Sequence, residues 1–367
     1  MENIINWWNN LDPLTSEEKD LLSKCLCHVK NDRLEKTKMV KDFESMGLLN
    51  DVPLTSSEED FIKLTDEFFS RMPNCNCTHL NKDLSFNSSC TAFINMLFDR
   101  LVDNDTLIIT SDNEHPSLKK KIEEYPNKMI LNHYTDIRQY NIDKIIRESV
   151  KYKEVFVYII GTRNDTGEIT PQDFFIELKK AFIKNNIKHT IVLDDVQGMF
   201  VVPRDYSMFD YVLGTGHAMV NNYDLGIMIS NSYFGGYKAY NWGKDYLERL
   251  DILLKRQNKM NIFKQLLEQY YSKELDKNSN RAYAQRLSTP FIFYMKLENK
   301  IVSEEVTKLL SKINLLLPAN THSPTMFFRL RSHWFLLDNT LLPKCIKVIR
   351  YILDNDTIDI EAIRSMI

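Results

Sequence analysis

Several features that would mark a specialised class of protein are missing from this 367-residue chain. The six cysteines are too few and too scattered for a disulfide scaffold. Two pairs, Cys25 with Cys27 and Cys75 with Cys77, have one-residue spacers, whereas zinc sites use spacers of roughly two to four residues. The longest central apolar run, 155–160, is far shorter than the roughly 20 residues of a membrane span. The sequence therefore predicts neither a metal site nor a membrane-spanning helix.

An excess of basic charge is also missing, because the formal net charge is −3. Without it there is no electrostatic argument for nucleic acid or a membrane surface as a partner. Residues 1–8 lack the basic region and the long apolar stretch of a signal peptide. The hydrophobic fraction of 43% and the charged fraction of 26% are ordinary for a soluble globular protein, so we expect a cytoplasmic one.

Residues 1–80 have the pattern of helices with long connections. The segment 13–22 returns almost unchanged at 53–62, and each copy has a Thr with a Glu three residues later, the capping-box spacing of a helix start. Because this similarity does not recur after residue 80, we interpret it as two similar helix starts and not as a repeat protein. The second helix is expected to bury four residues at helical spacing: Phe61, Leu64, Phe68 and Met72.

Short apolar runs after residue 80 predict the strands of an α/β domain. They are residues 107–110, 155–160, 191–193, 211–213 and 227–229. The continuous hydrophobicity of 155–160 indicates a strand buried on both faces. A Leu- and Lys-rich segment, 245–275, predicts one long helix leading to a smaller C-terminal domain, with strands at 291–297 and 325–330 and a helix at 342–353. Asp194 and Gln197 follow a predicted strand, at the edge where open α/β sheets bind ligands.

The spacing of polar residues around this edge carries a family resemblance. Asp194-x-x-Gln197 is followed by Asp210 and, seven residues later, by His217. This order resembles the cofactor core of fold-type I pyridoxal phosphate (PLP) enzymes, in particular the class V aminotransferase and cysteine desulfurase group. The resemblance implies a mostly parallel seven-stranded sheet sandwiched by helices, a small C-terminal α/β domain and a homodimer. We place an N-terminal helical segment at 1–80, the large domain at 81–245, and the linking helix with the small domain at 246–367.

The same resemblance implies roles for individual residues. In the family an aspartate keeps the pyridine nitrogen protonated, a glutamine donates to the phenolate oxygen, a His after Glu stacks on the ring, and an Asn donates toward the ring oxygen. The corresponding residues here are Asp194, Gln197, His115 and Asn164, and the phosphate would be surrounded by Cys90, Thr91, Thr215 and His217. The substrate is an α-amino acid, whose carboxylate would be gripped by Arg329 through its spacing to His333, with Arg331 as the alternate.

The lysine that forms the Schiff base with PLP in the family is missing. Its position is occupied by Ala218, and no lysine occurs between Lys188 and Lys238. We favour an engineered Lys-to-Ala variant that traps an external aldimine over a naturally degenerate chain acting as a noncatalytic binding partner or subunit. No cysteine follows Arg329 in the position of a desulfurase nucleophile, which argues against that reaction. A transaminase, a Cβ lyase and an epimerase remain open.

Overall fold

The structure is a computed structural model of residues 1–367. It describes residues 2–10, 12–22, 57–87, 89–163, 168–216, 225–238 and 240–262, together with shorter segments after residue 264, of which 340–355 and 357–366 are the longest. For the strands between 282 and 331 only the backbone is described. The chain divides into two compact units. The larger comprises Lys24–Arg163 and Ile169–Leu250, and the smaller comprises Met1–Ser23, Asn164–Glu168 and Asp251–Ile367.

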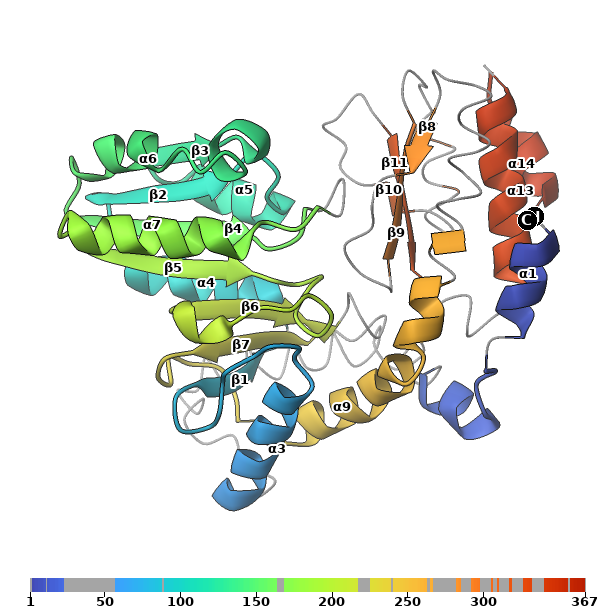
Figure 1. The fold of residues 1–367 in the computed structure, drawn as a ribbon, viewed down its shortest axis with the longest axis horizontal. Coiled ribbons are helices and arrows are strands. Elements are labelled where there is room, and N and C mark those ends of the chain that lie inside the picture. Colours follow the sequence, from blue (N-terminus) through green and yellow to red (C-terminus); the bar gives the residue numbers. More distant parts are fainter. Residues whose placement is uncertain are drawn as a thin grey trace. The chain divides into compact units, whose positions relative to one another are not determined.

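A seven-stranded sheet forms the centre of the larger unit, in the order β1-β7-β6-β5-β4-β2-β3 (Figure 1). Its strands are β1 (Asp83–Asn87), β2 (Thr106–Ser111), β3 (Lys128–Leu131), β4 (Glu154–Ile160), β5 (His189–Asp194), β6 (Tyr211–Thr215) and β7 (Gly226–Ser230). Four pairings are parallel, and β7 pairs antiparallel with both β6 and β1, so β7 alone runs against the others. The expected mostly parallel seven-stranded sheet is confirmed.

Helices cover both faces of this sheet, with α4 on one face and α6 and α7 on the other (Figure 1). The described helices of the larger unit are α3 (Glu58–Ser70), α4 (Cys90–Leu101), α5 (Pro116–Ile122), α6 (Ile142–Ser149), α7 (Gln172–Lys184) and the first eleven residues of α9 (Tyr240–Leu254), with a π-helical turn at His133–Ile137 and a 3-10 turn at Tyr206–Met208. On the α4 face, Phe98 packs with Phe156 and Val192 in one buried cluster. Since strand side chains alternate, residues two positions beyond Val192 point to this same face.

Two strands of this sheet are not evident from the sequence. The segment around Leu84 and Phe86 is short and polar at alternate positions, and it looks like a loop running into a helix. In the structure it is β1, which pairs with β7 in the register Leu84↔Ile229 and buries Leu84 and Phe86 completely. The edge strand β3 is also not among the strands that the sequence predicts. Both strands depend on partners distant in sequence, which local patterns do not reveal.

The two similar helix starts differ in their caps. At the first, Thr15 and Glu18 form the expected reciprocal pair, with N···O distances of 3.0 and 3.1 Å. At the second, the cap lies two residues later than predicted: Ser57 Oγ accepts from the amide of Asp60 at 3.1 Å, and α3 begins at Glu58. The expected buried face of α3 and the following turn is confirmed by Phe61, Leu64, Phe68 and Met72.

The smaller unit contains a four-stranded antiparallel sheet in the order β10-β11-β9-β8. Its elements are α1 (Glu2–Asn9), β8 (Ala282–Ala284), β9 (Ile292–Leu297), β10 (Leu317–Pro318), β11 (Met326–Arg331), α13 (Leu341–Asp354) and α14 (Ile360–Met366), together with the helical residues 16–22. The predicted strands 291–297 and 325–330 and the helix 342–353 are confirmed to within one residue. Among the helices that the structure describes, none combines the length and apolar composition needed to cross a membrane.

The single long helix predicted for 245–275 is wrong where the structure describes it. The helix α9 ends at Leu254, two turn residues follow, and residues 257–262 are helical again. The cause is the side chain of Arg256, which donates to the carbonyl of Ile252 at 2.8 Å and takes the acceptor that its own amide would use in an α-helix. That amide bonds to the carbonyl of Leu253 instead, at 2.9 Å.

Arg256 also holds the N-terminal segment, so we expect its removal to destabilise the smaller unit. Its guanidinium contacts Glu18 Oε2 at 2.6 Å and the carbonyl of Asp12 at 3.1 Å, and both side chains of the ion pair are largely buried. Arg256→Ala should lower the free energy of unfolding by about 2 kcal/mol, measured by urea denaturation. The matched control is Arg364→Ala, which breaks an exposed pair with Glu361 and should cost under about 0.5 kcal/mol. Equal losses in the two variants would contradict this account.

Candidate functional site

A buried carboxylate lies at the carboxyl end of β5. Asp194 is 2% exposed and follows Val192 by two residues, so it points to the α4 face of the sheet. Its Oδ2 accepts a hydrogen bond from the hydroxyl of Tyr158 at 2.8 Å, and its Oδ1 accepts from the amide of Val196 at 3.3 Å. Burial raises the pKa of Asp194 to about 6, against the opposing effect of the Tyr158 bond. A poorly solvated carboxylate of this kind is suited to a buried cationic partner.

The start of α4 lies at the same edge of the sheet. Ser89 caps the helix by accepting from the amide of Ala92 at 3.2 Å, and the amides of Cys90 and Thr91 have no intrahelical acceptor. Gly226 of β7 packs so closely here that a Cβ on it would lie 2.4 Å from the Ser89 carbonyl oxygen and 2.8 Å from the Cys90 nitrogen. A helix start of this kind favours an anion.

The predicted residues of the α4 face therefore meet. Gly226 pairs with Thr215 in the sheet, which brings Thr215 next to the start of α4. Cys90 lies close enough to Asp194 for the carboxylate, together with burial as the larger cause, to raise the pKa of the thiol well above its ordinary value. The structure thus brings Cys90, Thr215 and Asp194 to one edge.

His115 approaches from the loop after β2. It caps α5, and its Nδ1 lies 2.5 Å from Ser117 Oγ and accepts from the Ser117 amide at 3.3 Å. The same Ser117 hydroxyl lies 3.5 Å from Thr91 Oγ1 on α4. Ser117 therefore links Thr91 to His115, a connection that the sequence did not indicate because the two helices are joined only in the fold.

Glu114, next to His115, is buried and 1% exposed. Its Oε1 accepts from the amide and the hydroxyl of Ser111 and from the amide of Ile160, at 3.2 Å and 3.1 Å for the two amides. Its Oε2 is a buried oxygen with no hydrogen-bond partner. Burial, and to a smaller extent the charge of Asp194, raise the pKa of Glu114 to about 8. The sequence shows Glu114 only as the residue before His115 and predicts no separate role for it.

The residue after Asp194 points the other way. Asp195 accepts from the hydroxyl of Tyr206 at 2.6 Å and lies 3.3 Å from Nε of Arg204, which is itself buried. Arg204 donates to the carbonyl of Gly161 at 2.6 Å and so joins the end of β4 to the end of β5. Asp195 and Arg204 are missing from the predicted site, and no motif in the sequence pairs them.

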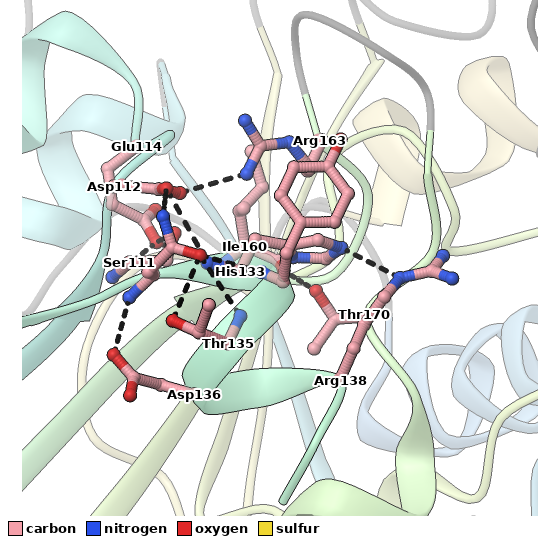
Figure 2. A network of polar contacts seen from close by, with 12 residues as sticks. Ser111, Asp112, Glu114, His133, Thr135, Asp136, Arg138, Ile160, Arg163 and Thr170 are labelled. Carbon is pink, nitrogen blue, oxygen red and sulfur yellow. Dashed lines mark hydrogen bonds and ion pairs between the residues drawn. The ribbon is translucent and has the colours of Figure 1, made fainter. Parts of the chain in front are cut away.

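A second polar network lies at the ends of β2 and β4 (Figure 2). Arg163 forms an ion pair with Asp112 at 2.8 Å, and its guanidinium carbon lies 5.5 Å from the ring centroid of Tyr134. Asp112 also accepts from the side-chain amide of Asn132 at 3.1 Å, while Arg138 Nε donates to His133 Nε2 at 3.3 Å. This network joins the loops that follow β2, β3 and β4. Arg163 is not among the residues that the sequence predicts for the site.

The remaining predicted residues are distributed as follows. Gln197 is buried in the turn after β5. Asn164, His217 and Ala218 lie outside the described residues. Arg329 and Arg331 lie two positions apart on β11, where they pair with Tyr294 and Ile292 of β9. In the part of the chain that the structure describes, no three His, Cys, Asp or Glu side chains gather as a metal ion requires.

Comparison with solved structures identifies the fold. Superposition on the NifS-like protein from Rickettsia africae ESF-5 gives a TM-score of 0.60 at 18% identity, covering 86% of this chain and 96% of that chain. A putative PLP-dependent beta-cystathionase from Corynebacterium diphtheriae gives 0.61 at 9% identity, covering 88% and 89%. The PLP-bound C-S lyase from Staphylococcus hominis gives 0.58 at 10% identity, covering 82% and 83%. No family profile and no curated protein sequence matches the chain. The chain therefore has the fold that these PLP-dependent enzymes share.

Proposed function

We propose that this chain binds PLP at the carboxyl edge of its parallel sheet and acts on an α-amino acid, by aminotransferase or Cβ lyase chemistry of the class V type. The observation that carries the proposal is Asp194, a buried carboxylate beside a helix start, in a fold shared with PLP-bound enzymes. The pairing of a poorly solvated carboxylate with an anion-binding helix terminus matches a ligand that has a basic ring nitrogen and a phosphate.

The described residues fit that ligand. The Asp194 carboxylate would hold a proton on the pyridine nitrogen, while the start of α4 with Cys90, Thr91 and Thr215 would take the phosphate. Bound there, PLP would supply an electron sink for the substrate α-carbon. His115 would cover one face of the ring, and Gln197 and Asn164 would donate to its oxygen. His217 would join the phosphate ligands.

The substrate carboxylate would bind a guanidinium on β11. Arg329 is the proposed ligand and Arg331 the alternate, because residues two positions apart share a strand face. Replacing this arginine would raise KM for the amino acid far more than it would change PLP affinity. We further propose that the protein is a homodimer. A monomer in light scattering would contradict that assembly.

The residue at position 218 decides whether the protein can catalyse turnover of a substrate. An alanine offers neither an amine for covalent attachment nor a base for the α-proton, so the chain as it stands would bind PLP without a covalent link. We propose that the alanine replaces a catalytic lysine, as an engineered change would. A second candidate, suggested by the same residue, is a degenerate chain that serves as a noncatalytic partner or subunit.

The test is Ala218→Lys. We expect the variant to turn yellow with PLP and to form a covalent bond that borohydride makes permanent on Lys at this position, detected by mass spectrometry. It should also gain activity on an α-amino acid, because a tethered amine acts at high effective concentration. Ala218→Met, of similar length but without an amine, is the control and should gain neither property. If Ala218→Lys forms no covalent bond, position 218 is not the lysine position. Bond formation without turnover of amino acids would favour the noncatalytic role.

A further inference from the structure

The turn between β2 and α5 carries His115, and the side chain of the neighbouring Glu114 anchors this turn to the sheet. Three donors converge on a single oxygen of its carboxyl group: the Ser111 amide, the Ser111 hydroxyl and the Ile160 amide all donate to Oε1. Ser111 ends β2 and Ile160 ends β4, so one side chain ties two strand ends and the turn together. Figure 2 shows Ser111, Glu114 and Ile160 in this arrangement.

The two oxygens of Glu114 are therefore unequal. Oε1 has all three donors, whereas Oε2 is buried and has no partner. In an ionised carboxylate the charge is shared between both oxygens, and a buried oxygen without a donor would leave part of that charge unsolvated. A neutral acid lowers this penalty when the acceptor oxygen keeps its donors and the other oxygen carries the proton, because an unpaired buried hydroxyl costs less than an unpaired share of a charge. The pattern of bonds thus favours the protonated form, with the proton on Oε2.

The neighbouring charges favour the same state. The charge of Asp194 on β5 acts on Glu114. Tyr158 on β4 donates to Asp194, and both carboxyls and Cys90 of α4 raise the pKa of its hydroxyl, after burial as the largest cause. Two buried carboxyls that act on one another do not ionise equally. Asp194 has a donor on each oxygen, whereas Glu114 has donors on Oε1 alone, so the charge is better solvated on Asp194. In the proposed function a cationic ligand stabilises the same carboxylate.

We propose that Glu114 is a positioning residue of this site: protonated on Oε2, it ties the His115 turn to the end of β4 and leaves Asp194 as the ionised member of the two. The inference rests on the proposed function, because an ionised Asp194 is needed there to pair with a cationic ring. It assigns no contact between Glu114 and any ligand. Its role is exerted through His115 and Asp194.

The first experiment measures the stability of the protein without PLP as a function of pH. The pKa of Glu114 is raised from 4.5 to about 8 in the folded protein. Between these values the folded state binds one more proton than the unfolded state, so stability falls as pH rises. Relative to Glu114→Gln, which mimics the neutral acid, the unfolding equilibrium constant of the unmodified protein should rise up to about tenfold per pH unit in this window. Glu123→Gln, an exposed residue at the end of α5, is the control and should keep the original pH dependence. Parallel curves for the unmodified protein and Glu114→Gln would overturn the inference.

The second experiment measures PLP affinity by absorbance titration at neutral pH. Glu114→Ala removes the acceptor of three donors and should weaken PLP binding by about tenfold or more. Glu114→Gln keeps an acceptor oxygen and should restore most of the affinity. Failure of Gln to restore it would overturn the positioning role. If the unmodified protein binds no PLP, the proposed function fails and the positioning role fails with it, while the pH dependence of stability still decides whether Glu114 carries the proton.

Discussion

Replacing Asp194 with asparagine should strongly weaken PLP binding and at the same time leave the folded protein as stable as before, or more stable, at neutral pH. A charge-assisted bond from a pyridinium to a buried carboxylate contributes roughly 3 kcal/mol, so its loss should weaken binding by about a hundredfold. Asparagine still offers an oxygen to the Tyr158 hydroxyl, so the local packing is retained. The measurement is a PLP titration followed by absorbance, together with urea denaturation of the cofactor-free protein.

The stability part of this prediction follows from the pKa of Asp194, which burial raises from 3.8 to about 6. For an acid whose pKa is higher in the folded state, stability falls as pH rises from the unfolded value to the folded one. Above pH 6 the ionised group therefore costs stability, and the neutral amide should recover up to about 3 kcal/mol. Asp105→Asn, at an exposed position before β2, is the control and should change neither property. Unchanged PLP affinity in Asp194→Asn would remove the basis of the proposed function.

The same variant separates the two candidate functions. If the chain is a catalytic protein, loss of Asp194 removes both the cofactor and any activity that Ala218→Lys restores. If the chain is a noncatalytic subunit, Asp194→Asn should leave its association with a partner unchanged, because the residue is buried inside the larger unit.

Gly226→Ala should destabilise the protein by about 2 to 3 kcal/mol, more than any other glycine-to-alanine change on the central strands. The added Cβ would lie 2.4 Å from the Ser89 carbonyl oxygen and 2.8 Å from the Cys90 nitrogen, which are backbone atoms at the start of α4. They can retreat only if the helix start moves, so PLP affinity should fall together with stability. Urea denaturation and a PLP titration measure the two effects.

Gly214→Ala on the neighbouring strand is the matched control. Its Cβ would meet the sulfur and terminal methyl of Met199 at 2.5 Å, the flexible end of a side chain that can rotate away. We expect a loss of less than about 1 kcal/mol at this position. Equal losses at Gly214 and Gly226 would show that the close approach to α4 does not set the cost.

Much of the fold could be predicted because it is encoded locally. The apolar run at 155–160 is the interior strand β4, since six consecutive apolar residues suit a strand buried on both faces. The start of α4 is also encoded locally, because the hydroxyl of Ser89, directly before an amphipathic segment, caps a free amide of the first turn. The polar residues that follow strands predict the proposed ligand edge, because parallel strands bring their carboxyl ends together.

Other features were decided by contacts between segments far apart in the chain. β1 is a strand because β7 pairs with it. The helix α9 ends at Leu254 because the Arg256 side chain donates to the carbonyl of Ile252 and to groups in residues 12–18. The sequence predicts Asp194 as a site residue but does not show that its surroundings differ from those of Asp195. Because side chains alternate along a strand, Asp194 points toward Tyr158 and Asp195 points toward Arg204. The protonation of Glu114 likewise follows from burial and from three donors contributed by two strand ends.

Sequence by itself determined the order of the elements and the residue types at the proposed ligand edge, because hydrophobic period and helix capping are local properties. Tertiary structure decided which carboxyl is charged, because solvation and neighbouring donors exist only once the strands are packed.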